Sequence, residues 1–312
     1  MHIKPSENIH LFGLDPFFNE IKKLYDKKKL PHKILLSGKK GLGKSTLAYH
    51  IINYILSSNE DYKYDIDKFN INIENKSYKL IQNCSHPNFY LIDLIDEKKS
   101  IDIAQIRQMI VYTNKSNFNE NPRFILIDNI ENLNKNSVNA LLKVMEEPNE
   151  GIFFILINNN EKQILPTLKS RCLTFKVNLS FEESINIANH ILNRNIFELI
   201  NSDIINYYIT PGEIINLINL ADEKKINLSE YDLIGLLTLL IDSGYYKKNR
   251  LVKRMIINFI ELFFLKAYRL SNTKKSLLYF YHNFLDKINN TEKFNLDEEC
   301  LFLEFKTKLL HE

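Results

Sequence analysis

The feature that most constrains the fold of this chain is an eight-residue segment, residues 38–45, with the sequence GKKGLGKS. It matches the pattern G-x-x-x-x-G-K-S/T at every position. Glycines in such a loop let backbone N–H groups wrap around phosphates, and the following helix points its positive N-terminal end at them. An apolar strand-like segment, 33–38, precedes the loop, and an amphipathic segment, 46–56, follows it. This context favours a phosphate-binding loop over a glycine-rich turn that binds nothing.

Individual residues of the loop have separate chemical tasks. The ammonium group of Lys44 would reach the β- and γ-phosphates of a nucleotide, and the hydroxyl group of Ser45 would ligate Mg²⁺. The residues that we expect to contact the nucleotide in and after the loop are Gly38, Gly41, Gly43, Lys44, Ser45 and Thr46.

Such a loop normally works with an acidic residue on a neighbouring strand. The segment FILID ends at Asp128 after four apolar residues, and from there a carboxylate can hold Mg²⁺ together with Ser45. Asn129 follows, and its amide cannot serve as a general base because it has no usable conjugate acid near neutral pH. Glu131 lies two residues later and would share the side of Asn129 on an extended strand, but the chain is expected to turn there. We expect Glu131 to be a solvated surface carboxylate instead.

Apolar segments of strand length alternate with helical segments through the first half of the chain. The strand-like segments are 33–38, 88–94, 123–128 and 151–158. The helical segments are 46–56, 101–113 and 134–148, the last of which is stopped by Pro148. The polar stretch 57–76 lacks periodicity and is predicted to be a loop. This alternation predicts an α/β fold with a parallel sheet that helices cover on both faces.

Helical patterns dominate after about residue 176, with a break at Pro211 and Gly212. An apolar stripe at spacing i, i+4, i+7 and i+11 consists of Ile256, Ile260, Phe263 and Ala267. We therefore expect three domains, namely an α/β domain over 1–176, a small helical domain over 177–225 and a helical C-terminal domain over 226–312.

The composition is that of an ordinary globular protein, with 45% hydrophobic residues, 25% charged residues and a net charge of +3. The first residues lack the apolar core of a signal peptide, and the longest apolar runs are too short or too interrupted to span a bilayer. Cys84, Cys172 and Cys300 lie far apart and predict neither a zinc site nor a disulfide framework. We expect a soluble, cytoplasmic protein without a membrane partner.

Two further segments resemble bacterial DNA clamp-loader subunits, which are AAA+ proteins. Residues 139–148, NALLKVMEEP, are similar to a segment that follows the acidic strand in that family, and residues 165–172, LPTLKSRC, are similar to its Ser-Arg-Cys motif. By pattern alone, the first segment is an amphipathic helix with a proline stop, and Arg171 is a surface arginine that caps a helix. Weaker matches to the family lie at 30–32, 85–88, 101–107 and 294–297.

The resemblance implies an AAA+ P-loop domain, a helical lid domain and a helical collar domain through which subunits assemble. It implies that Arg171 is an arginine finger, which reaches in trans into a neighbouring subunit's ATP site and contacts several phosphate oxygens. Ser170 and Cys172 are then packing residues, and we expect His32 and His86 to be structural. The implied partners are gamma/tau and delta subunits, the sliding clamp and, through the complex, primer–template DNA.

Three departures from the motor gamma/tau subunits favour a subunit of the delta-prime type. The interval between the loop and Asp128 contains only Cys84, whereas motor subunits carry a four-cysteine zinc module there. Asn129 replaces their catalytic glutamate, and Glu213, which would repel a triphosphate, replaces a sensor arginine. We therefore expect ATP and Mg²⁺ to bind without efficient hydrolysis. The alternatives are an active gamma/tau-like ATPase and an unrelated P-loop enzyme, such as a small-molecule kinase.

Overall fold

The computed structural model describes residues 4–95, 98, 100–115, 119–146, 149–205, 208–247, 249–270, 274–294 and 298–307. The predicted helix stop at Pro148 and most of the weak match at 294–297 lie outside these residues. The chain divides into two compact units, of which the first comprises 1–187 with 210–212 and the second comprises 188–209 with 213–312.

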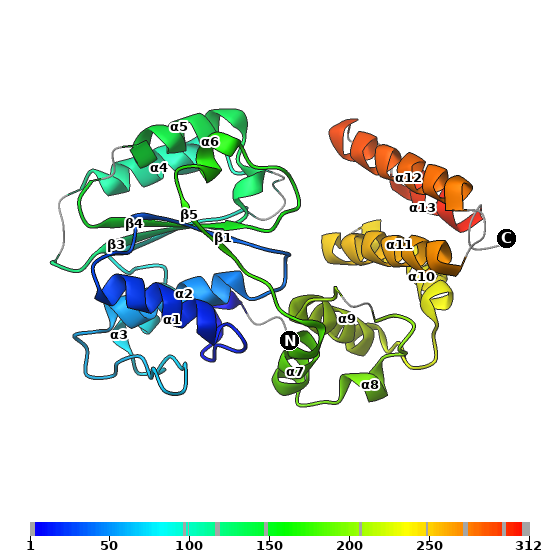
Figure 1. Ribbon diagram of the computed structural model, residues 1–312, viewed down its shortest axis with the longest axis horizontal. Helices are drawn as coiled ribbons and strands as arrows, with labels where there is room; N and C mark the ends of the chain where they lie inside the picture. Colours follow the sequence, from blue (N-terminus) through cyan, green and yellow to red (C-terminus); the bar gives the residue numbers. More distant parts are fainter. Residues whose placement is uncertain are drawn as a thin grey trace. The chain divides into compact units, whose positions relative to one another are not determined.

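The first unit is built on a five-stranded sheet (Figure 1). Its strands are β1 (Lys33–Ser37), β2 (Phe89–Ile92), β3 (Arg123–Ile127), β4 (Ile152–Asn158) and β5 (Leu173–Lys176). Their order across the sheet is β2-β3-β4-β1-β5, and every neighbouring pair is parallel. The carboxyl ends of all five strands therefore lie along the same edge of the sheet.

Helices cover both faces of this sheet (Figure 1). One face carries α1 (Asp15–Asp26), α2 (Lys44–Leu56) and α3 (Lys76–Gln82), and the other carries α4 (Ile103–Thr113), α5 (Lys135–Glu146) and α6 (Pro166–Lys169). Successive residues of a strand point to opposite faces. Leu36 of β1 therefore packs in one core with Leu47 of α2, and Leu35 packs in the other core with Leu141 of α5. The predicted α/β fold with a parallel sheet covered on both faces is confirmed.

Several elements of the first unit are absent from the sequence-based prediction, among them β5, α1 and α3. The last predicted strand ends at residue 158, but β5 follows it and occupies one edge of the sheet. It has four residues, of which only Phe175 is buried, so it lacks the apolar run that marks the inner strands. Helix α3 has seven residues, too few for a clear helical period.

The second unit is helical in all its described regular elements. Its helices are the end of α7 (Phe181–Leu192), α8 (Ile196–Leu199), most of α9 (Pro211–Lys224), α10 (Leu233–Asp242), α11 (Arg250–Leu270), α12 (Lys274–Phe294) and α13 (Glu298–Phe305). The predicted stripe lies on α11, where Ile256 and Ile260 are buried. The predicted domain boundaries at 176 and 225 stay predictions. Among the described residues, no helix is both long enough and apolar enough to cross a membrane.

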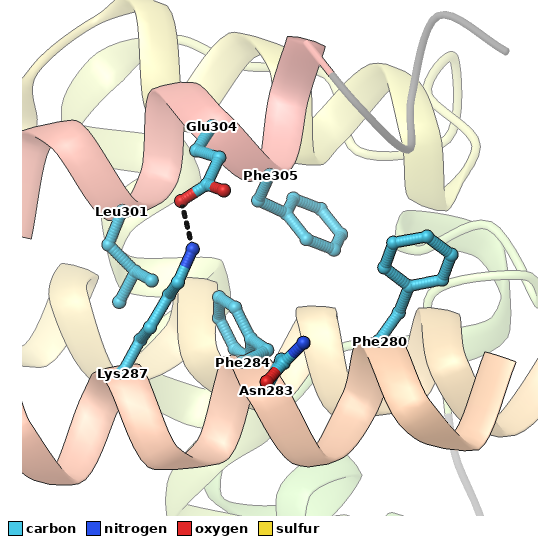
Figure 2. Close-up of a pocket in the computed structure, with 7 residues that line it drawn as sticks. All are labelled: Phe280, Asn283, Phe284, Lys287, Leu301, Glu304 and Phe305. Carbon is cyan, nitrogen blue, oxygen red and sulfur yellow. Dashed lines mark hydrogen bonds and ion pairs between the residues drawn. The ribbon is translucent and has the colours of Figure 1, made fainter. Parts of the chain in front are cut away.

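A small open cavity of about 100 Å³ lies between helices α12 and α13 (Figure 2). Its apolar lining consists of Phe280, Phe284, Leu301 and Phe305. Lys287 of α12 and Glu304 of α13 form an ion pair of 2.6 Å between the two helices. Pockets for nucleotide-sized ligands measure roughly 300 Å³ or more. The cavity is therefore too small for a nucleotide.

A buried histidine joins α2 to the N-terminal segment. His50 is fully buried, its Nε2 lies 3.0 Å from the carbonyl oxygen of Asn8, and its Nδ1 lies 2.8 Å from the hydroxyl of Tyr64. A neutral ring satisfies both contacts, with Nε2–H donating to Asn8 and Nδ1 accepting from Tyr64. Burial lowers the pKa of His50 to about 4.

We expect His50 to make the free energy of unfolding depend on pH. Its ring stays neutral in the folded chain, so the unfolded chain binds the proton first as the pH falls below about 6.5. The contribution of neutral His50 to the free energy of unfolding is fully present above about pH 6.5. It decreases by about 3 kcal/mol as the pH falls to the pKa of about 4 that His50 has in the folded chain. Urea unfolding should show that the difference between wild type and His50→Gln shrinks over this range. A difference that stays constant would contradict the prediction.

Candidate nucleotide-binding site

The glycine-rich loop connects β1 to α2, and three of its glycines have structural reasons to be glycine. Gly41 and Gly43 have φ angles of 87° and 84°, in the left-handed region that side chains other than glycine rarely adopt. A Cβ atom on Gly38 would lie 2.3 Å from the carbonyl oxygen of Val177, just after β5. The loop therefore has the backbone shape and the close packing that its sequence predicts.

The predicted phosphate ligands lie at the start of α2. Lys44 is 3% exposed, and its Nζ donates a hydrogen bond of 2.7 Å to the carbonyl oxygen of Lys39 within the loop. The N–H groups of the first helical turn, which includes Ser45 and Thr46, have no carbonyl partner four residues earlier within the helix. Together with the loop glycines, they form a setting in which backbone donors can bind phosphate.

Ser45 and Asp128 meet although they are 83 residues apart in sequence. The Ser45 hydroxyl donates a hydrogen bond of 2.5 Å to Oδ2 of Asp128, which follows β3. A hydroxyl and a carboxylate are oxygen ligands of the kind that Mg²⁺ takes together with the phosphates of a nucleotide. These two residues therefore fit the predicted Mg²⁺ position. Among the described residues, no group of three or more His, Cys, Asp or Glu side chains could hold a metal ion. A Mg²⁺ ion at this position would therefore need the phosphates of a nucleotide as further ligands.

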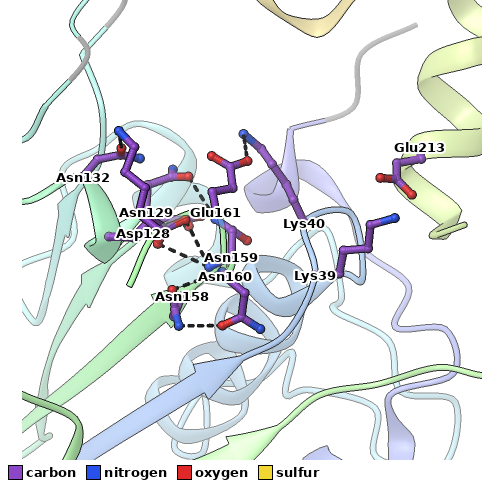
Figure 3. Close-up of polar contacts among 12 residues, drawn as sticks. Lys39, Lys40, Asp128, Asn129, Asn132, Asn158, Asn159, Asn160, Glu161 and Glu213 are labelled. Atoms are coloured by element: carbon purple, nitrogen blue, oxygen red, sulfur yellow. Dashed lines mark hydrogen bonds and ion pairs between the residues drawn. The ribbon is translucent and has the colours of Figure 1, made fainter. Parts of the chain in front are cut away.

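A chain of polar contacts runs along the carboxyl edge of the sheet beside this pair (Figure 3). Asn129 adopts a left-handed conformation with φ of 55°. Its Nδ2 donates to Oδ1 of Asp93 at 2.6 Å, and its Oδ1 accepts from Nδ2 of Asn159 at 2.9 Å. Its backbone N–H donates to Oδ1 of Asp128 at 2.7 Å. The Asn129 side chain thus links residues that follow β2 and β4.

The expectation that Glu131 is a solvated surface carboxylate is wrong. Glu131 is 8% exposed, and both of its carboxylate oxygens accept from the backbone N–H of Asn159, at 3.2 and 3.3 Å. Residues Ile130–Asn132 form a short 3-10 helix that turns the side chain back toward the end of β4. Burial raises the pKa of Glu131. The carboxylate therefore fastens the end of β4 to the segment after β3.

Sequence analysis did not identify Asp93 and Asn159 as members of this site. Each directly or closely follows an apolar strand, β2 or β4, and that position is the signal that could have found them. Burial, and secondarily the charge of Asp128, raises the pKa of Asp93.

A segment distant in sequence contacts the loop backbone. The Thr210 hydroxyl donates to the carbonyl oxygen of Lys40 at 3.0 Å, and the Gly212 N–H donates to the carbonyl oxygen of Gly41 at 3.0 Å. A Cβ atom on Gly212 would lie 2.7 Å from Cα of Gly41, so only glycine fits there without a shift.

The next residue, Glu213, belongs to the second unit. There its Oε1 accepts from Nδ2 of Asn258 on α11, at 2.9 Å. The expected repulsion between Glu213 and a triphosphate stays a prediction.

Arg171 lies just after α6, and its side chain is 36% exposed. One guanidinium nitrogen donates to the carbonyl oxygen of Thr167, and the other donates to Oε1 of Glu146, both at 2.8 Å. The first contact is the helix-capping contact expected of a surface arginine. Within the chain Arg171 is thus held by partly exposed groups, and its role as an arginine finger stays a prediction.

The other motif residues have structural contacts. His32 stacks on Phe153 and its Nδ1 lies 2.8 Å from the carbonyl oxygen of Ile152, while His86 contacts the Ser77 hydroxyl through Nε2 at 3.1 Å. These contacts agree with the structural roles expected of both histidines, which stay predictions. Burial raises the pKa of Cys172 to about 11, so its sulfur is a protonated packing group.

Comparisons with known proteins agree with this arrangement. A family described as "DNA polymerase III, delta subunit" matches residues 14–180. The delta' subunit of DNA polymerase III from Buchnera aphidicola subsp. Schizaphis graminum is 32% identical over 171 residues, which are 54% of this chain and 50% of that protein. The gamma subunit from the same organism is 36% identical over 168 residues, covering 53% of this chain and 44% of that protein. The chain thus spans about half the length of these relatives.

Among solved structures, a DNA polymerase III gamma-subunit-related protein from Thermotoga maritima covers 88% of this chain and 78% of its own, with 18% identity and a TM-score of 0.39. The fold assignment rests on the parallel sheet itself rather than on this distant likeness. The family match covers more than half of the 312 residues and includes the loop, the Asp128 strand and Arg171. The resemblance to bacterial clamp-loader subunits is confirmed, and the chain belongs to the DNA polymerase III delta-subunit family.

Proposed function

We propose that this chain is a delta-prime-type subunit of a DNA polymerase III clamp loader, which binds ATP with Mg²⁺ but hydrolyses it poorly. It lends Arg171 to the ATP site of an adjoining gamma/tau motor subunit. The observation that carries the proposal is the combination of a complete phosphate loop, with Ser45 bonded to Asp128, and an amide at position 129. The first feature supports nucleotide binding, and the second removes the usual general base.

The carboxylate of Glu131 gives no simple substitute for that base. Both oxygens of Glu131 are engaged by the backbone of Asn159, and the side chain is buried. A general base must come within hydrogen-bond distance of the water from which it takes a proton. Freeing Glu131 for that task would leave the Asn159 N–H without its partner, at a cost of about 1–3 kcal/mol. Slow turnover is therefore expected.

The local contacts of Arg171 are compatible with a role in trans. An ion pair between partly exposed groups, such as that with Glu146, contributes about 0–1 kcal/mol. A guanidinium group that exchanges this partner for phosphate oxygens loses little and gains charge-assisted hydrogen bonds. The partners in this proposal are gamma/tau and delta subunits, the sliding clamp and, through the complex, primer–template DNA. Assembly would use the helical region 226–312.

A gamma/tau-like motor ATPase is the second candidate, favoured by the 36% identity to the Buchnera gamma subunit. ATP turnover by the isolated chain separates the two candidates. We expect turnover at least about tenfold slower than that of a gamma subunit measured side by side, because Asn129 cannot accept a proton. Comparable turnover would favour the motor assignment.

Substitution of Lys44 tests the nucleotide site. Lys44→Ala should weaken binding of a fluorescent ATP analogue about 10- to 100-fold, because it removes a charge-assisted contact with phosphate. Lys39→Ala is the matched control, since it removes the same charge from the same loop while keeping the carbonyl oxygen that holds Lys44. Equal losses in the two variants would point to general charge attraction instead of a specific phosphate ligand.

Substitution of Arg171 tests the finger. In a reconstituted loader, Arg171→Ala should reduce DNA-stimulated ATP hydrolysis at the adjoining motor site by about tenfold or more, because transition-state charge loses a guanidinium partner. Gel filtration should show unchanged assembly. Lys169→Ala removes a nearby exposed charge and should leave the rate unaltered. A wild-type rate in the Arg171 variant would reject the role.

A further inference from the structure

Two neighbouring carboxylates follow β2 and β3, and the proposed site uses only Asp128. In the other, Asp93, Oδ1 accepts two hydrogen bonds, from the backbone N–H of Leu94 and from Nδ2 of Asn129, both at 2.6 Å. Among the residues that the structure describes, Oδ2 of Asp93 has no hydrogen-bond partner. The carboxylate is therefore anchored through one oxygen while the other is available.

The surroundings of Asp93 favour a cation. Burial disfavours its charged form, and the charge of Asp128 adds to this effect, while Lys40 of the phosphate loop acts in the opposite direction. Asn129 contacts both carboxylates, through its backbone N–H to Asp128 and through its side chain to Asp93. Two carboxylates that share one neutral amide in this way repel each other, and a divalent cation beside them relieves that repulsion.

Glu131, at the same edge of the sheet, is a carboxylate with a structural contact only, and it can be compared with Asp93. Both of its oxygens share the backbone N–H of Asn159, so the whole carboxylate is committed to one structural contact. Asp93 is less buried than Glu131 and has one oxygen uncommitted. This difference separates a carboxylate that can serve a bound cation from one that holds two strands together.

We propose that Asp93 is the second carboxylate of the cation-binding half of this nucleotide site, where Oδ2 orders the water shell of the Mg²⁺ held by Ser45 and Asp128, and where Asn129 positions Asp93. This inference rests on the proposed binding of ATP with Mg²⁺. Asn129 is thereby a positioning residue with a task of its own. Its side-chain amide gives Asp93 a donor and gives the side-chain amide of Asn159, just after β4, an acceptor.

The test is a Mg²⁺ titration of the full chain with mant-ATP, a fluorescent ATP analogue. Binding is measured first in EDTA and then at increasing Mg²⁺ concentration. Asp93→Asn keeps an acceptor oxygen for Leu94 and Asn129 but removes the charge. It should raise the Mg²⁺ concentration at half-saturation about fivefold, which corresponds to about 1 kcal/mol. Affinity for mant-ATP in EDTA should stay as in wild type.

Two further variants make the test specific. Asn129→Ala should raise the Mg²⁺ midpoint as well, and in the Asp93→Asn background it should add nothing, because its effect acts through Asp93. Glu131→Gln neutralises a carboxylate at the same edge whose oxygens are already occupied, so it should leave the midpoint unchanged. Electron paramagnetic resonance of Mn²⁺ in place of Mg²⁺ gives an independent readout of the cation in the same variants.

Each outcome decides between defined alternatives. A Mg²⁺ midpoint in Asp93→Asn equal to wild type, or a shift in Glu131→Gln as large as that in Asp93→Asn, overturns the inference and leaves the proposed function standing. If wild type binds mant-ATP neither in EDTA nor with Mg²⁺, the proposed nucleotide binding fails, and the inference fails with it. If circular dichroism shows that Asp93→Asn is unfolded, Asp93→Ser replaces it, with the same expected shift.

Discussion

The parallel pairing of five strands in the order β2-β3-β4-β1-β5 is the constraint on which the site depends. Because the strands are parallel, each contributes the residues after its carboxyl end to one edge of the sheet. Along that edge come Asp93 after β2, Asp128 after β3, Asn159 after β4 and the phosphate loop after β1. Val177, after β5, closes the row against Gly38. In this order only β4 lies between β1 and β3, and Ser45 reaches Asp128 across it.

The two cores hold this order in place. Inner strands such as β3 are buried on both faces, and their apolar side chains alternate between the core under α2 and the core under α5. A shift of one residue in register would exchange the two sets of side chains and move Asp128 along the edge. The polar contacts at the edge are therefore built on positions that apolar packing has already fixed. These polar contacts add specificity at the ends of the strands, next to solvent.

The sequence predicts those parts of the site that are contiguous in the chain or end an apolar run. The loop at 38–45 and Asp128 could be found because each has its own local pattern. Asp93 also follows an apolar run, but its contact with Asn129 joins residues 36 apart and depends on β2 lying next to β3, which local patterns do not specify. Glu131 was misjudged for a related reason, since a single short 3-10 turn decides whether its carboxylate faces water or β4. The edge strand β5 was missed because it is short and half exposed.

The amide at position 129 does more than remove a general base. A glutamate there would bring a third negative charge beside Asp93 and Asp128, and at a few ångströms each like-charge pair costs on the order of 1 kcal/mol even in a polar environment. Asn129 instead donates to Asp93 and accepts from Asn159, so it satisfies two neighbours that a carboxylate could not serve together. The neutral residue and the extra carboxylate are thus mutually dependent. Under the proposed function, a site with this pair would keep the groups that hold a nucleotide and a cation while giving up the group that would activate water.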